Sequence, residues 1–242
     1  MRILNLGCGT KTSNSPYMIN IDWSIYLRLK KIKILAAIAP LVIKGGRLER
    51  FNSLPDNIMV HNLANGIPFD SDSVDAAYHS HMLEHLDRDV AKTFLMEVKR
   101  VLKPGGIHRI VVPDFEVACR AYIAHIATCE TNLRESDNHD FHTAKVLEQS
   151  VRREAHGTSQ QNPLRRFIEN MILGDARRRG ETHQWMYDRI SLKMMLINLG
   201  YKEPRIQEFN TSQIPNWNEY GLDTDNNGNQ YKIDSLYMEA VK

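Results

Sequence analysis

A glycine loop and a carboxylate stand near the start of the chain, each directly after a short apolar segment. Gly7-Cys8-Gly9 follows residues 3–6, and glycines there let the backbone approach a ligand closely and take positive φ angles. Asp22 ends the second segment, where its carboxylate could accept hydrogen bonds from both hydroxyls of a ribose. Its alternative role is to cap a helix that begins at Ser24. The loop alone is a weak signal, but its pairing with this acid favours a nucleoside site.

Asn62 ends a third apolar segment, at residues 58–62. Its side-chain amide could contact the edge of an adenine ring, because an amide both donates and accepts hydrogen bonds. The alternative is an ordinary turn residue, a role for which asparagine is well suited. Both interpretations stay open from the sequence.

Histidines gather at the end of a fourth apolar segment, at residues 74–79. His79, His81 and His85 stand there, and His183 lies in a later segment that could cover the same place. Histidine is the side chain best suited to proton transfer near neutral pH. The alternative is a structural or surface role, which most histidines have.

These residues can meet only if a sheet brings the ends of their segments to one edge. Strand-like segments occur at residues 3–6, 17–22, 58–62, 74–79, 107–112, 205–209 and 233–241. Helix-like segments occur at residues 24–39, 87–102, from 114 onward, 163–173 and 191–199. Their alternation predicts an α/β fold: a doubly wound, mostly parallel seven-stranded sheet whose last strand runs antiparallel. We expect one domain over residues 1–242, with a shortened first helix and helical insertions near 24–56 and 132–190.

Several motifs occur in a fixed order over residues 3–112. They are Ile3-Leu4-Asn5-Leu6-Gly7-Cys8-Gly9, Asn20-Ile21-Asp22, Asn62-Leu63 with Ile67-Pro68-Phe69, Val74-Asp75-Ala76-Ala77-Tyr78 with Met82-Leu83-Glu84-His85, and Glu97 to Gly106, which contains the letters RVLKPGG. Together they resemble the motifs of class I S-adenosylmethionine-dependent methyltransferases. The resemblance implies a Rossmann-like methyltransferase fold with S-adenosylmethionine as cofactor. It implies cofactor contacts at Leu6, Gly7, Cys8, Gly9, Asp22, Trp23, Asn62, Leu63, His79 and Ser80.

The activity that this resemblance implies is methyl transfer to a small-molecule or glycan acceptor, with an oxygen atom as the expected target. An oxygen acceptor must lose a proton, ideally to a base whose pKa lies near the operating pH. His81, His79 and His183 are the candidates, with His81 first. Glycans are included because residues 112–114, 185–188 and 234–237 resemble a bacterial subgroup associated with surface-polysaccharide biosynthesis.

Two departures from the family pattern concern the glycine loop. The family usually has an acid where Asn5 stands and a third glycine where Lys11 stands. Only 14 residues separate Gly7 from Asp22, whereas a complete crossover with its helix takes a dozen or more beyond the loop. The first helix must therefore be truncated or absent, which leaves open how the methionine end of the cofactor is held.

The composition is that of an ordinary globular protein, with 42% hydrophobic and 25% charged residues and a net charge of +2. Three cysteines without a CxxC pair or a Cys/His zinc spacing predict neither a disulfide framework nor a metal site. We expect a cytoplasmic protein, because no signal peptide or membrane span is visible. The basic helix-like stretch at residues 26–43 could touch a membrane surface, or could simply pack on the sheet.

Three other functions can be weighed against methyl transfer. The truncated first helix is compatible with a cofactor-binding regulator or interaction module that does no chemistry. Seven arginines between residues 151 and 180 could serve an RNA methyltransferase, although a solvated helix face explains them better, and nucleic acid is not expected as a partner. A nicotinamide dehydrogenase is disfavoured, because Thr12 stands where the third glycine of Gly-x-Gly-x-x-Gly would be.

Overall fold

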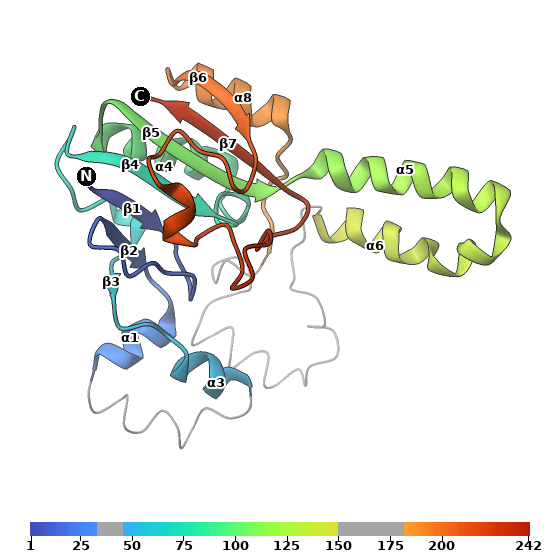
Figure 1. Ribbon diagram of the computed structural model, residues 1–242, viewed down its shortest axis with the longest axis horizontal. Helices are drawn as coiled ribbons and strands as arrows, with labels where there is room; N and C mark the ends of the chain where they lie inside the picture. Colours follow the sequence, from blue (N-terminus) through green and yellow to red (C-terminus); the bar gives the residue numbers. More distant parts are fainter. Residues whose placement is uncertain (33–45, 150–181) are drawn as a thin grey trace.

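A seven-stranded sheet forms the centre of the protein (Figure 1). The computed structural model describes residues 1–32, 46–149 and 182–242. The strands are β1 (Ile3–Leu6), β2 (Met18–Asp22), β3 (Ile58–Val60), β4 (Val74–Ser80), β5 (Leu102–Pro113), β6 (Lys202–Gln207) and β7 (Ser235–Val241). Their order across the sheet is β3-β2-β1-β4-β5-β7-β6. All pairs from β3 to β5 are parallel, and β7 runs antiparallel to both neighbours, which confirms the predicted α/β fold.

Helices flank this sheet along the described parts of the chain. They are α1 (Ile25–Lys31), α3 (Gly46–Asn52), α4 (Arg88–Val101), α5 (Phe115–Thr131), α6 (His139–Gln149) and α8 (Arg189–Asn198), with short 3-10 helices η1 (Leu63–Asn65), η2 (Leu83–His85), η3 (Leu133–Asn138) and η5 (Trp217–Tyr220). None of these helices is long and apolar enough to cross a membrane. The predicted helix at 163–173 and the arginine-rich stretch lie outside the described residues, as does the part of the predicted helix at 24–39 that follows residue 32.

No helix connects β1 to β2, so the predicted shortening of the first helix is confirmed. A hydrogen-bond network of side-chain amides holds this connection in place. The amide nitrogen of Asn5 donates to the backbone oxygen of Lys11 and to the side-chain oxygen of Asn20, both at 3.0 Å. Asn20 in turn donates to the backbone oxygen of Ser13 at 3.0 Å. Buried amides thus satisfy backbone groups that a helix would otherwise have satisfied internally.

The two faces of the sheet are covered in different ways. One face packs on α4 and α8, whose buried residues include Leu95 and Leu196. The other face, over β1 and β4, packs on the segment that connects β6 to β7. Trp217 and Leu222 of that segment contact the cluster that contains Ile3 and Tyr78. The segment that connects β6 to β7 therefore covers this face of the sheet, in a chain that has no helix between β1 and β2.

Two strands, β5 and β6, differ from their predicted bounds by three residues or more. β5 begins at Leu102, five residues before the expected start, because Leu102 pairs with Val74 and a bulge accommodates the following proline and glycines. β6 spans Lys202–Gln207, where the prediction was 205–209. This edge strand is largely exposed, so its sequence carries no apolar alternation that would mark its ends.

Helices α5 and α6 form an antiparallel pair that projects away from the sheet (Figure 1). Among the residues of α5 only Ala118 is fully buried. The polar stretch from residue 132, where a helical insertion is expected, begins with η3 and α6. The pair therefore draws little stability from an apolar core.

Candidate functional site

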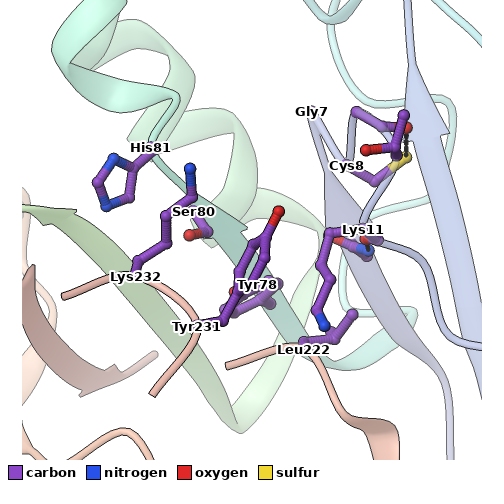
Figure 2. A pocket seen from close by; sticks show the side chains of 12 residues that line it. Gly7, Cys8, Lys11, Tyr78, Ser80, His81, Leu222, Tyr231 and Lys232 are labelled. Atoms are coloured by element: carbon purple, nitrogen blue, oxygen red, sulfur yellow. Dashed lines mark hydrogen bonds between the residues drawn. The ribbon is translucent and has the colours of Figure 1, made fainter. Parts of the chain in front are cut away.

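A pocket of about 230 Å³ opens at the carboxyl ends of β1 and β4 (Figure 2). Its lining consists of Asn5, Gly7, Cys8, Gly9, Thr10, Lys11, Tyr78, Ser80, His81, Leu222, Tyr231 and Lys232. Figure 2 shows the glycine loop and Lys11 on one side, with His81 and Lys232 on the other. This edge is where ligands bind in doubly wound sheets. The structure thus brings the glycine loop, Ser80 and His81 together, as the sequence predicted for the cofactor end of the site.

The glycine loop requires glycine at two positions for different reasons. Gly7 and Gly9 have φ angles of +65° and +56°, in the left-handed region that other residues enter at a cost. A Cβ on Gly7 would also lie 2.7 Å from the sulfur of Met82. A Cβ on Gly9 would meet no atom within 4 Å. Packing against Met82 therefore leaves no room for a side chain at position 7, whereas the space beside Gly9 is open.

Asp22 holds the glycine loop from the end of β2. One carboxylate oxygen accepts a hydrogen bond from the backbone nitrogen of Gly9, and the other accepts one from Ser24, each at 2.8 Å. The hydroxyl of Ser24 caps α1 by accepting from Leu27, so the alternative capping role for Asp22 is wrong. A carboxylate has about four acceptor positions, of which these contacts use two.

Lys11 anchors the loop to the segment before β7. Its ammonium donates to the backbone oxygen of Thr224 at 2.7 Å and lies 4.4 Å from the centre of the Tyr231 ring. Burial lowers the pKa of Lys11, and the nearby Asp223 and Asp225 oppose that effect. The lysine at the family's glycine position therefore ties down the part of the chain that closes the pocket.

His81 follows β4 and takes a φ angle of +49°. Its Nε2 lies 2.8 Å from the hydroxyl oxygen of Ser235, and its Nδ1 lies 3.6 Å from a carboxylate oxygen of Glu84. Burial, together with the nearby Lys232, His183 and His85, lowers the pKa of His81 to about 3. The imidazole is therefore neutral at physiological pH.

Glu84 is a buried carboxylate to which the sequence assigned no role. Its side chain is 1% exposed, and no described residue donates a hydrogen bond to its oxygens. Burial raises the pKa of Glu84 to about 8, although Lys232 opposes this. His85 lies behind it, with Nε2 at 3.7 Å from the carboxylate, and the ring of His183 stands 5.0 Å from that of His85. The predicted His183 also lies within 4.8 Å of Glu84, so the Glu84 carboxylate stands between it and His81.

His79 points away from the pocket, because alternate residues of a strand face opposite sides of a sheet. Tyr78 and Ser80 line the pocket, whereas His79 packs between Phe94 and His108, with ring centres 5.3 and 5.1 Å away. The side chain is fully buried, and burial lowers its pKa to about 3. The structure does not bring the His79 side chain to the pocket with His81.

The remaining predicted cofactor contacts lie outside this pocket. Asn62 caps η1 by accepting a hydrogen bond from the backbone nitrogen of Ala64 at 3.0 Å, and Leu63 is the first residue of that helix. Trp23 is 43% exposed, with the Arg28 guanidinium 4.5 Å from its ring centre. Leu6 is fully buried in the core.

The pocket wall is fixed by a buried charge network that the sequence did not reveal. The hydroxyl of Tyr78 donates to Asp223 at 2.6 Å. The same carboxylate pairs with Arg109 at 2.8 Å, and Arg109 pairs with Glu239 at 2.9 Å. The three charged side chains are no more than 3% exposed. These residues come from β4, β5, β7 and the segment that connects β6 to β7. They lie far apart in the sequence, so no local pattern indicates that they meet.

These residues fit an adenosyl cofactor. The loop offers an unobstructed edge at Gly9, where no atom lies within 4 Å of an added Cβ, and Asp22 stands directly beside it with free acceptor capacity. The pocket continues from the loop to His81, so a group bound along the loop would present one end there.

Comparisons with known proteins found a matching family model and similar solved structures. Residues 4–110 match a family model described as a methyltransferase domain. No curated protein matches the chain significantly in sequence. Solved structures similar to the chain include a SAM-dependent methyltransferase from Archaeoglobus fulgidus, at 14% identity and a TM-score of 0.43, covering 100% of this chain and 86% of that one.

Two further structures are similar at the same level. One is an S-adenosylmethionine-dependent methyltransferase from Mesorhizobium loti, at 14% identity and a TM-score of 0.43, covering 100% of this chain and 90% of that one. The other belongs to a complex of the Haloferax volcanii Trm112 methyltransferase activator with a methyltransferase, at 14% identity and a TM-score of 0.44, covering 99% and 81%. Residues 4–110, less than half of the chain, are thus similar to a methyltransferase domain.

Proposed function

We propose that the protein transfers a methyl group from S-adenosylmethionine to a hydroxyl oxygen of a small-molecule or glycan acceptor. The observation that carries this proposal is the position of His81, which lines the pocket beside the glycine loop and has the buried Glu84 behind it. A hydroxyl must lose a proton when it is methylated, and this pair offers a route for that proton. When bound, the cofactor supplies a methyl group already activated on a sulfonium.

The residues of the chain divide the binding work. The backbone of residues 7–9 and the carboxylate of Asp22 hold the ribose end, with Asn62 and Leu63 on the adenine side. Lys232 lines the opposite side of the pocket and can pair with the carboxylate at the methionine end. Leu222 and Tyr231 of the covering segment exclude water from the same space. Orientation and exclusion of water are the main contributions a protein makes when the cofactor carries the reactive group.

His81 and Glu84 move the proton in this proposal. The acceptor hydroxyl gives its proton to Nε2 of His81, at the place where the Ser235 hydroxyl now lies. Nδ1 of the same ring passes its own proton to the Glu84 carboxylate, which closes from 3.6 Å to hydrogen-bond distance. Glu84 must be ionised to accept it, so the rate is expected to rise with pH up to about 8. Because its pKa is low, the imidazole of His81 can pass a proton on to Glu84 but does not retain it.

The glycan part of the proposal has its own support. The three segments that resemble the polysaccharide-associated subgroup meet at the ends of β5 and β7. Asp114 forms a bridge with Tyr187, and its backbone nitrogen donates to Asp234 at 3.0 Å. Ser235, the next residue, is the partner of His81. These segments therefore border the proposed acceptor side of the pocket.

The test compares binding with turnover. Calorimetry with S-adenosylhomocysteine measures cofactor binding, and transfer of labelled methyl to a panel of sugars, nucleotide sugars and small alcohols measures activity. His81→Gln is expected to bind the cofactor as the wild type does and to lose about 100-fold or more in kcat, the usual range for a general base. His61→Gln, a histidine outside the pocket that contacts Gly66, is the matched control. Cofactor binding without turnover on any acceptor would favour the non-catalytic binding module instead.

A further inference from the structure

The α5–α6 pair carries a cluster of histidine and cysteine side chains that the methyl-transfer site does not use. His125 and Cys129 lie one turn apart on α5, and His139 begins α6. Nδ1 of His125 lies 3.1 Å from Nδ1 of His139 and 3.4 Å from the sulfur of Cys129. The three potential ligand atoms all lie within 4.8 Å of one another. The cluster thus joins two helices that share little apolar core.

Hydrogen bonding alone does not account for this convergence. A neutral imidazole has one lone pair, on one ring nitrogen. If Nδ1 of His125 accepts from His139, that lone pair is used and the Cys129 thiol has no acceptor. If it donates to His139, it has no lone pair for the thiol, and the sulfur can only share that N–H as a weak acceptor. A cation between the three atoms would satisfy all of them through their lone pairs.

The spacing matches that of a zinc-type ion. Zinc bound about 2.0–2.1 Å from nitrogen and 2.3 Å from sulfur places the atoms of a tetrahedron roughly 3.3–3.6 Å apart. The two separations from Nδ1 of His125, 3.1 Å to His139 and 3.4 Å to Cys129, lie close to those edges. His142 stacks on His125 with ring centres 4.0 Å apart, and its buried Nδ1 has no hydrogen-bond partner among the described residues. The fourth position is open to His142, after a rotation of its ring, or to water.

We propose that His125, Cys129 and His139 bind a divalent, borderline-soft metal ion of the zinc class. The ion replaces the thiol proton of Cys129, which is released to solvent, and the proton between the two histidines moves to Nε2 of the ring that carried it, so both imidazoles stay neutral. It joins α5 to the start of α6 and so stabilises the projecting helix pair. This inference does not depend on the proposed acceptor or on the role of His81.

Cobalt(II) is the probe, because thiolate coordination gives it a near-ultraviolet charge-transfer band and tetrahedral geometry gives it intense visible bands. The full-length protein is stripped with a chelator and titrated with cobalt, which zinc then displaces. One equivalent is expected to produce both sets of bands. Cys129→Ser is expected to abolish the thiolate band, and Cys119→Ser, another cysteine of α5, to keep it. His125→Ala and His139→Ala are expected to weaken cobalt binding more than about tenfold. Mutating even a hydrogen-bond partner of a metal ligand commonly costs that much, and these variants remove a ligand itself.

Two controls keep the outcome unambiguous. Glu84, His85 and His183 also lie within ligand distance of one another, but that group has no sulfur and cannot produce the thiolate band. Circular dichroism and binding of S-adenosylhomocysteine show whether each variant is folded, since the cluster lies outside the pocket. Zinc should raise the melting temperature of the wild type and of Cys119→Ser, and not that of Cys129→Ser. A titration without a thiolate band, or the same band in Cys129→Ser, would overturn the proposal.

Discussion

The side-chain amide of Asn5 donates to the backbone oxygen of Lys11 at 3.0 Å, and this hydrogen bond spans the base of the glycine loop. A second hydrogen of the same amide reaches the oxygen of Asn20. Both partners are acceptors, so the position needs a donor. The acid that related methyltransferases carry there could donate to neither partner when ionised. Asn5 therefore supplies the hydrogen-bond donors that hold the connection between β1 and β2 where no first helix is present.

Asn5→Asp is expected to destabilise the fold. The substitution removes both donors and places a charge on a side chain that is 1% exposed, facing two oxygens. A loss of about 3 kcal/mol in the free energy of unfolding is expected, because an unpaired buried charged group costs more than a neutral one. Urea denaturation measures it. Asn52→Asp, on the exposed side of α3, should change little, and an equal loss in both variants would contradict the network.

Gly7→Ala should destabilise more than Gly9→Ala. Each alanine must take a positive φ angle, at a cost of about 1–2 kcal/mol. Gly7→Ala must in addition push the sulfur of Met82 away from 2.7 Å, whereas Gly9→Ala meets no neighbour. Thermal unfolding of the two variants without cofactor isolates the packing difference. Equal melting temperatures would mean that the Met82 side chain moves aside without a cost in stability.

Arg109→Met is expected to cost about 3–5 kcal/mol in the free energy of unfolding, because it leaves two buried carboxylates without their partner. Asp223 and Glu239 are those carboxylates, and both pair with Arg109 within 2.9 Å. Lys92→Ala breaks an exposed pair with Asp89 and should change stability by less than about 1 kcal/mol. Adding Asp223→Asn and Glu239→Gln to Arg109→Met should recover part of the loss. No recovery would assign the effect to packing against Trp217 and Tyr237.

Glu84→Gln should change the pH dependence of stability. The folded-state pKa of Glu84 is raised to about 8 from 4.5, so between these values the unfolded state releases a proton that the folded state keeps. Stability from this group therefore falls as pH rises from about 4.5 to 8. The groups near its carboxylate are His81, His85, His183, Lys232 and Tyr187.

His81 acts in the opposite direction at lower pH. Its folded-state pKa is lowered to about 3, so its contribution to stability is lost as pH falls below 6.5. Denaturation at pH 6.5 and pH 8 avoids that range. Glu84→Gln should gain stability relative to the wild type between these two pH values. A constant difference would show that Glu84 is already ionised at pH 6.5.

Asp22→Ala should weaken binding of S-adenosylhomocysteine by about 1–3 kcal/mol, the usual cost of losing a charged hydrogen-bond partner. The substitution also frees the backbone nitrogen of Gly9, so the loop loses part of its support. Calorimetry measures the affinity, and circular dichroism checks the fold. Asp56→Ala, whose 91% exposed carboxylate pairs with Lys30, is the control. Unchanged affinity would refute the ribose assignment.

The sheet could be predicted because each strand is a local pattern. The runs at residues 3–6 and 74–79 are apolar enough to be recognised as buried, and the glycines and Asp22 mark their ends. The short distance from Gly7 to Asp22 revealed the missing helix by chain length alone. The edge strand β6 was placed less well, since an exposed strand has no apolar alternation to read.

The site could be predicted only in part, because strand direction and distant contacts decide it. His79 and His81 look equivalent in the sequence, but one side chain enters the core and the other reaches the pocket. Glu84 was visible only as a letter in a motif, and its importance comes from burial without a hydrogen-bond donor among the described residues. The cluster around Cys129 escaped a search for linear zinc spacing, since His139 comes from another helix.

The sequence by itself determined the seven strands along the chain, the glycine loop with its acid, and the shortening of the first helix. Those features depend on neighbours along the chain, where apolar periodicity, turn residues and segment length are sufficient. Only the tertiary structure decided that the segment before β7 covers the sheet, that Lys11 fastens it at Thr224, and that Arg109 holds the pocket wall. Residues more than 100 positions apart form these contacts. Their pairing follows from packing and the need to neutralise buried charge, which no local pattern records.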